Sequence, residues 1–179
     1  PKQTCYQNNS ADMSETHEIY QPIMAELSSN VVGFGMWIGL DADIRIATDD
    51  VSFWLRAPQW GIATIPAGWF PKIMPWAIAS ELLLLAEPLS ARRAYELGMI
   101  NKIVPENHLM TEAERMAARF CELSPTAVQG MKESMIKASS LDYAAINHIT
   151  EDVQTRVMNS DDRKEGGKAF LEKRKANWD

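Results

Sequence analysis

Aromatic residues and one arginine fall together in a segment that could form a ligand pocket. Flat apolar rings can wall a pocket for a bulky or aromatic group, although core packing is the commoner role of any single Trp. Arg56 lies among them, and its guanidinium could hold a carboxylate or carbonyl of a ligand, or simply be solvated. The aromatic residues of this segment are Phe34, Trp37, Trp54, Trp60, Trp69 and Phe70.

Basic side chains gather near the end of the chain. Lys168, Lys173 and Arg174 belong to the last predicted helix. They could pair with phosphate groups of a ligand. The alternative is that they are solvated and interact favourably with the helix dipole. Four further residues could act as an acid or a base, and the sequence favours none of them: Asp12, Glu15, His17 and Asp41.

Short elements must position the aromatic segment. Gly33-Phe34-Gly35 precedes a helix or turn at residues 38–40, and glycine lets the backbone approach a ligand closely. The alternative is a glycine-rich turn before a helix. Apolar spacing predicts a helix over residues 16–29, interrupted at Pro22. Strands are predicted over residues 44–47 and 51–54, followed by an ordered aromatic loop over residues 58–75.

The rest of the chain is predicted to be mostly helical. Residues 81–105 read as helix, turn, helix and strand, with Ser90 as an N-cap and Gly98 as a left-handed stop. An amphipathic helix is predicted over residues 106–123. Another begins at Ser124-Pro125, with Gly130 as a weak point. Two more are predicted over residues 141–158 and from Ser160 or Asp161 to about Arg174.

Composition excludes several classes of partner. The 179 residues suffice for one domain with a real core, and the net charge is −6 with scattered Lys and Arg. Without a basic stripe, neither nucleic acid nor a membrane is an expected partner. The longest apolar run, residues 82–86, is too short to span a bilayer, and no signal peptide is expected. Cys5 and Cys121 are predicted to be free thiols in a reducing, cytoplasmic compartment.

Three segments closely resemble a known family. They are residues 81–105, the run Asp43-Ile-Arg-Ile-Ala47, and the tail Glu165-Gly-Gly-Lys-Ala-Phe-Leu-Glu-Lys-Arg174. All resemble signatures of the crotonase superfamily, the enoyl-CoA hydratase/isomerase family, which works on acyl-coenzyme A thioesters. The resemblance implies an α/β fold: a crotonase-like ββα core in residues 1–105, lacking the family's N-terminal strands, and a C-terminal helical trimerisation region in residues 106–179. It also implies a homotrimer or a dimer of trimers.

The resemblance further implies an oxyanion hole of two backbone N–H groups. The family's first donor loop is similar in spacing to residues 4–13 and places one donor at Asn8. Counting back from Asp43 puts the second donor at Phe34 or Gly35. The residues expected to bind the acyl substrate are Asn9, Ser10, Ala11, Trp37, Trp54, Arg56, Ala57 and Trp69, and those expected to bind the coenzyme A phosphates are Lys168, Lys173 and Arg174.

The two glutamates used by hydratases of this family have no counterpart. The first position falls on Trp37 and the second on Ala57, within a motif whose Phe53 and Gly61 keep the family's spacing. Neither side chain can transfer a proton, so two-glutamate hydration is not expected. The first hypothesis is a lyase, isomerase or C–C hydrolase acting on an acyl-CoA. The alternatives are a catalytically silent CoA-binding or assembly subunit, and a partial crotonase that neither binds nor reacts. No metal is expected, and no cofactor besides coenzyme A as part of the substrate.

One feature departs from the family. Relatives have a buried strand directly before the glycine run. Because residues 16–29 are predicted to be helical, only residues 30–32 remain for that strand. The sequence therefore predicts that the strand is lost, or that residues are missing between Ser29 and Gly35.

Overall fold

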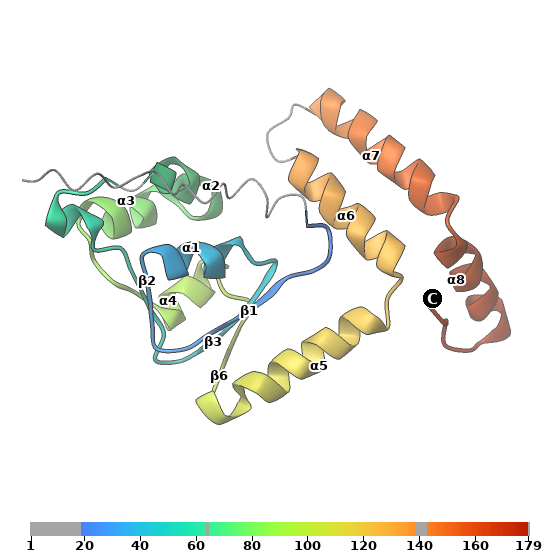
Figure 1. Cartoon of the computed structure of the whole chain (residues 1–179), viewed down its shortest axis with the longest axis horizontal. Helices are drawn as coiled ribbons and strands as arrows, with labels where there is room; N and C mark the ends of the chain where they lie inside the picture. Colours follow the sequence, from blue (N-terminus) through green and yellow to red (C-terminus); the bar gives the residue numbers. More distant parts are fainter. Residues whose placement is uncertain (1–18, 64, 139–142, 179) are drawn as a thin grey trace, which may run out of the picture. The chain divides into compact units, whose positions relative to one another are not determined.

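The computed structural model describes residues 19–63, 65–138 and 143–178 (Figure 1). These residues form two compact units. The first is Pro22–Glu122, and the second combines residues 19–21 with residues 123–178. Asn8, Asn9, Ser10 and Ala11 lie outside the described residues, as does Cys5.

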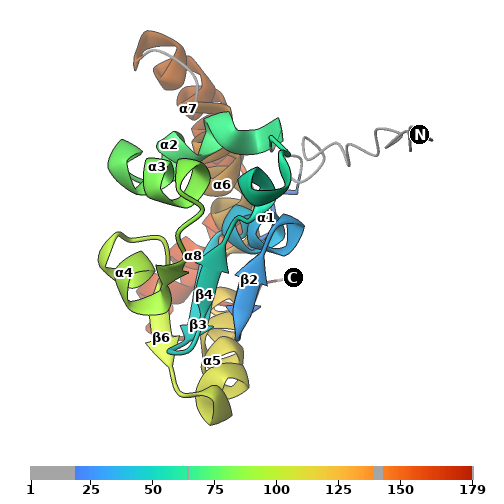
Figure 2. The same ribbon diagram turned by 90° about the vertical axis from the view of Figure 1, so that its left-hand side faces the viewer.

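Two small sheets organise the first unit (Figure 2). Strands β1 (Met24–Leu27), β3 (Ile44–Thr48) and β6 (Lys102–Val104) pair in parallel in the order β1-β3-β6. Strand β4 (Ser52–Trp54) pairs in parallel with β2 (Asn30–Val32) and antiparallel with β5 (Leu89–Ser90). Parallel pairing requires a crossover connection, which places α1 (Phe34–Asp41) between β2 and β3 in the chain.

The helix predicted over residues 16–29 is wrong throughout its described part, since residues 19–23 are irregular and a strand follows. Residues 24–27 are strand β1, in register from Met24 opposite Ile44 to Leu27 opposite Ala47. The Ile23 N–H donates to the Asp43 carboxylate at 2.8 Å, which fixes the start of this pairing. The strand expected before the glycine run is therefore present, and no residues need to be missing between Ser29 and Gly35. Ser29, with φ of 58°, turns the chain from β1 into β2.

Short helices surround the sheets. The expected aromatic loop over residues 58–75 is ordered but coils into 3₁₀ turns and short helices. Ser90 caps α4 (Ala91–Glu96) as predicted, because its hydroxyl accepts a hydrogen bond from the Arg93 N–H at 3.3 Å. Gly98 is left-handed with φ of 76°, also as predicted. The helices of this unit are η2 (Ala57–Trp60), η3 (Ile65–Trp69), α2 (Phe70–Ile73), α3 (Trp76–Leu84), α4 (Ala91–Glu96), η4 (Glu106–His108) and α5 (Leu109–Cys121).

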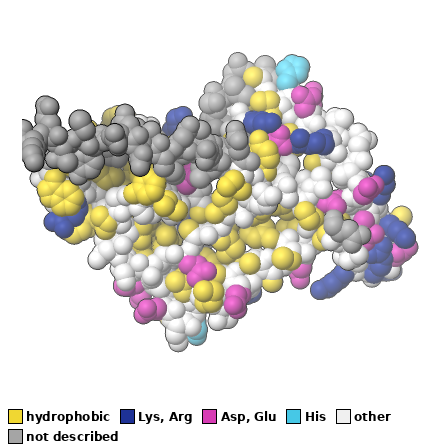
Figure 3. Space-filling view, viewed as in Figure 1, with side chains coloured by type: hydrophobic (Ala, Val, Ile, Leu, Met, Phe, Trp, Pro, Cys, Tyr) yellow, Lys and Arg dark blue, Asp and Glu magenta, His cyan; other side chains and the backbone are white. Residues whose placement is uncertain are grey.

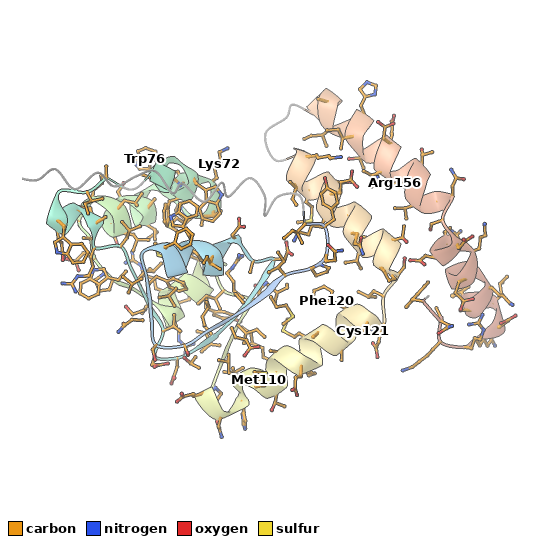
Figure 4. All side chains as sticks on the ribbon, in the orientation of Figure 1. Lys72, Trp76, Met110, Phe120, Cys121 and Arg156 are labelled. Carbon is orange, nitrogen blue, oxygen red and sulfur yellow. The ribbon has the colours of Figure 1, made fainter. Side chains whose placement is uncertain are left out.

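The core of the first unit joins the sheets to these helices. Phe53 of β4, Phe70 of α2 and Leu82 of α3 are fully buried in one apolar cluster with Met36 of α1. Arg45 ties α1 to β3 because its Nη1 donates to the Leu40 carbonyl at 2.7 Å and its Nε to the Met99 carbonyl at 2.6 Å. Burial lowers the pKa of Arg45. At the end of α5, Cys121 is an exposed free thiol (Figure 4).

The second unit is helical, as predicted. It contains α6 (Pro125–Ala138), α7 (Tyr143–Met158) and α8 (Asp161–Glu172). Gly130 is buried where α6 meets α7, and Glu133 of α6 pairs with Lys137 and with Arg156 of α7 (Figure 4). Ser160 caps α8 by accepting from the Arg163 N–H at 3.2 Å. None of the described helices is long and apolar enough to cross a membrane.

Candidate functional site

The candidate site begins where β2 and β4 end side by side. Val32 lies opposite Trp54, the last residue of β4. The Gly33 N–H continues the ladder by donating to the Trp54 carbonyl at 3.3 Å. Because the two strands are parallel, the segments that follow them leave from the same edge of the sheet. At this edge of parallel sheets ligands commonly bind.

The segment after β2 presents the first turn of α1. Gly33 has φ of 57° and ψ of −122°, a conformation that is accessible to glycine and costly for other residues. No side chain caps α1, and its first turn holds no acidic residue. The N–H groups of Phe34 and Gly35 therefore lack partners within the helix and lie at its positive end. An orphan backbone N–H at a glycine turn is one of the two donors that an oxyanion hole needs.

The side chain of Phe34 leaves this turn largely open. It is 57% exposed, and a Cβ built on Gly35 would meet no atom within 4 Å. The ring of Phe34 therefore does not fill the space around the first turn of α1.

An aromatic triad lies one turn further along α1. Trp37 contacts Trp69 with a centroid distance of 4.6 Å and Phe70 with a distance of 5.4 Å, edge to face. Trp37 is 8% exposed and Phe70 is fully buried. In the described part of the chain, Trp37 Nε1 is the one buried side-chain nitrogen or oxygen without a hydrogen-bond partner. Leaving such a donor unpaired costs about 1–3 kcal/mol.

The segment after β4 carries a stacked arginine. The guanidinium carbon of Arg56 lies 4.3 Å from the ring centroid of Trp54 and 5.7 Å from that of Trp60. Arg56 Nε donates to Gln59 Oε1 at 3.1 Å. Trp54 is itself fixed, since its Nε1 donates to the Ala86 carbonyl at 2.7 Å. The guanidinium is thus held at the edge where β4 ends.

The structure places some of the predicted site residues near one another along paired elements. Phe34, Gly35 and Trp37 share α1, while Trp54 ends β4 and Arg56 and Ala57 follow that strand. Gln59 was missed by sequence reasoning. The only sequence signal for Gln59 is that it lies three residues after Arg56. These two side chains meet because residues 57–60 form a 3₁₀ turn.

The basic residues of the tail lie in and after α8, in the second unit. Arg174 Nη2 donates to Glu165 Oε2 at 2.9 Å, and Arg174 Nε donates to Glu172 at 2.7 Å. The hydrogen bonds from Arg174 lower the pKa of Glu165 to about 2. Lys173 adopts a left-handed conformation with φ of 54° at the end of the helix. Arg174 is therefore already neutralised by carboxylates within its own unit.

Comparisons with known proteins agree with this architecture. A family model described as enoyl-CoA hydratase/isomerase matches residues 1–179. Carnitinyl-CoA dehydratase of Proteus mirabilis is 31% identical over 174 residues, covering 94% of this chain and 67% of the relative. The corresponding protein of Salmonella paratyphi B is 28% identical over the same length.

Solved structures give the same result. An enoyl-CoA hydratase/isomerase from Mycobacterium paratuberculosis superposes with a TM-score of 0.87 at 28% identity, covering 92% of this chain and 66% of that one. An enoyl-CoA hydratase from Polaromonas sp. JS666 gives 0.87 at 27% identity, covering 93% and 66%. The chain thus spans about two thirds of the length of these relatives. The predicted crotonase-like α/β fold is confirmed, and the chain belongs to the enoyl-CoA hydratase/isomerase family.

Proposed function

We propose that this protein binds an acyl-CoA thioester and stabilises negative charge on its carbonyl oxygen through backbone N–H groups. One donor is at Phe34 or Gly35, and the other is at Asn8. The observation that carries the proposal is the first turn of α1, where Gly33 presents uncapped N–H groups at the edge of a parallel strand pair. Each such donor contributes about 3–4 kcal/mol to an enolate-like transition state.

The chemistry proposed for this site does not use two glutamates. Positions 37 and 57 hold Trp and Ala, which cannot exchange protons. Isomerisation or C–C bond hydrolysis, with another acid or base, fits these residues better than hydration. Dehydration, the reaction in the name of the carnitinyl-CoA dehydratases, would likewise need an acid or base from elsewhere.

A second candidate function is a catalytically silent CoA-binding or assembly subunit. The same observation favours it, because an uncapped helix start and an aromatic wall can bind a thioester without reacting with it. In either case coenzyme A enters as part of the substrate. Its phosphates are proposed to pair with Lys168 and Lys173, and with Arg174 only if Arg174 leaves Glu165 and Glu172. We propose a homotrimer or a dimer of trimers, located in the cytoplasm.

Two measurements test the proposal. Titration calorimetry with coenzyme A and butyryl-CoA measures binding, and ultraviolet absorbance follows hydration of crotonyl-CoA. We expect butyryl-CoA to bind and crotonyl-CoA to remain unhydrated. Hydration at rates usual for a hydratase would overturn the roles given to Trp37 and Ala57. Absence of binding by either ligand would reject both candidate functions.

A further inference from the structure

We propose that Arg56 selects acyl-CoA thioesters whose acyl group ends in a carboxylate. The inference rests on the proposed function, since it names the substrate class of that site. Three observations support it: the guanidinium of Arg56 is held in place, Arg56 follows the end of β4, and Trp37 on α1 has an unpaired N–H.

The guanidinium of Arg56 is fixed but not neutralised. It stacks over Trp54 at 4.3 Å, and Nε is held by Gln59 at 3.1 Å. Within the described residues, no carboxylate pairs with Arg56, and its two terminal nitrogens have no partner. These nitrogens form the planar fork that matches a carboxylate. Stacking reduces the side-chain entropy that binding would otherwise cost.

The strand register brings this fork to the thioester end of the site. Arg56 follows Trp54 by two residues, just as Phe34 follows Val32 by two residues, and Val32 and Trp54 are partners in the parallel pair. The guanidinium and the first turn of α1 therefore emerge from the same sheet edge. An acyl chain whose carbonyl lies at this turn can extend toward Arg56.

Trp37 supplies an independent sign that the ligand carries acceptor atoms. Its Nε1–H is buried without a partner, on the helix that begins at Phe34 and one turn beyond it. A Phe at this position would fill the same apolar space without an unpaired donor. A ligand oxygen that reaches this donor would remove the cost of leaving it unpaired, and positions 37 and 57 contribute no negative charge of their own.

The same geometry disfavours a cationic acyl group. Quaternary ammonium groups bind to open aromatic faces. Here the face of Trp54 is covered by the guanidinium of Arg56, and Trp37 is packed against Trp69 and Phe70. A cation brought to this edge would meet the like charge of Arg56, which also lies 5.7 Å from the exposed ring of Trp60.

The test uses three thioesters of similar length and different terminal charge. They are glutaryl-CoA, valeryl-CoA and 4-trimethylammoniobutyryl-CoA, which end in a carboxylate, a methyl group and a quaternary ammonium. Calorimetry on the full chain measures each dissociation constant, with coenzyme A as the reference. We expect glutaryl-CoA to bind about 10- to 100-fold more tightly than valeryl-CoA, the range for a charged hydrogen-bonded pair, and the cationic thioester to bind most weakly.

Variants test whether Arg56 causes the preference for glutaryl-CoA over valeryl-CoA. Arg56→Gln should bring the ratio of glutaryl-CoA to valeryl-CoA affinity close to one, and Arg56→Lys should restore it only in part because the fork is lost. Trp37→Phe, which keeps a ring and removes the N–H, should lower the ratio less than Arg56→Gln does. Arg92→Gln, on the exposed side of α4, is the matched control and should keep the wild-type ratio. Urea unfolding confirms that each variant folds.

The outcomes separate the two proposals. If none of the three thioesters binds, the proposed function fails and this inference fails with it. If they bind with equal affinity, if the cationic thioester binds best, or if Arg56→Gln keeps the preference for glutaryl-CoA, only the assignment of Arg56 is overturned.

Discussion

At the scale of single residues, the site depends on one backbone conformation. Gly33 connects β2 to α1 with φ of 57° and ψ of −122° and directs the first N–H groups of the helix. The side chains around it, in contrast, are interchangeable apolar surfaces except for Arg56 and Trp37. The chemistry proposed above would therefore depend more on main-chain geometry than on titratable side chains.

Gly33→Ala should destabilise the protein by about 1–3 kcal/mol, because a Cβ makes this conformation strained. Butyryl-CoA binding should weaken as the helix start shifts. Urea unfolding and calorimetry measure the two effects. Gly68→Ala is the matched control, since its Cβ would also meet no atom within 4 Å and its φ is not positive. Equal stability of the two variants would show that the positive φ at Gly33 is unimportant.

Part of the site could be predicted from residue identity, and part could not. The sequence alone placed Trp37, Trp54 and Arg56 in one candidate site. It did not reveal the stacking of Arg56 on Trp54 or the unpaired Trp37 N–H, because both depend on side-chain packing across elements. The hydrogen bond between Arg56 and Gln59 depends on the 3₁₀ turn at residues 57–60. A turn of four residues is too short to be predicted from residue propensities.

At the scale of elements, most helices were predicted, but the helix expected over residues 16–29 was not found in its described part, and strands β1, β2 and β5 were not predicted. Ser90, Gly98 and Ser160 carry local signals that act within one turn, so the ends of their helices follow from the sequence. Strand β1 is only four residues long, and its apolar positions fit either period. Pairing with β3 decides its structure, and that contact spans about twenty residues of sequence, a range that local patterns do not report.

The two helices α6 and α7 are close because Gly130 has no side chain. A Cβ there would lie 2.8 Å from Val157 Cγ2 and 3.1 Å from Val153 Cγ1. Gly130→Ala should therefore destabilise the protein by about 1–3 kcal/mol despite the better helix propensity of Ala. A Cβ at Gly166 in α8 would lie 3.4 Å from the Trp178 ring, which is ordinary contact. Gly166→Ala should therefore leave stability unchanged or increase it. Thermal unfolding of both variants tests this; a stabilised Gly130→Ala would contradict the close approach.

At the scale of the whole molecule, both units contain carboxylates that lose stabilising bonds in acid. Hydrogen bonds from Arg115 and Lys102 lower the pKa of Glu112 to about 2. A hydrogen bond from Arg174 likewise lowers the pKa of Glu165 to about 2. A folded-state pKa below the unfolded value of 4.5 means that the contribution is complete above pH 4.5 and is lost as pH falls toward about 2.

Urea unfolding followed across this pH range should therefore show a steady loss of stability. The Glu112→Gln variant should show a shallower dependence, because one of the titrating groups is gone. The nearby Glu114→Gln variant, at an exposed position of α5, is the control and should keep the wild-type slope. Identical slopes for all three proteins would contradict the role given to Glu112.

Exposed apolar side chains on both units are available for self-association. Phe170 is 83% exposed and Leu171 is 81% exposed on α8. Trp76, labelled in Figure 4, is 74% exposed on the first unit, where Figure 3 shows hydrophobic side chains on the visible face. If the proposed trimer buries α8, Phe170→Glu should shift the protein toward monomers in sedimentation equilibrium. Lys164→Glu, an exposed change on the same helix, should leave the mass unchanged. A trimer that persists in Phe170→Glu would exclude Phe170 from the interface.

The contact between Trp37 and Trp69 has an optical consequence. Two indole rings 4.6 Å apart and tilted by 38° couple their electronic transitions, so the pair should give a split circular dichroism band of opposite lobes. A molecule entering between or beside the rings would change that band directly. If the proposed thioester binds beside these rings, a change in this band during a titration would report its binding without an attached label.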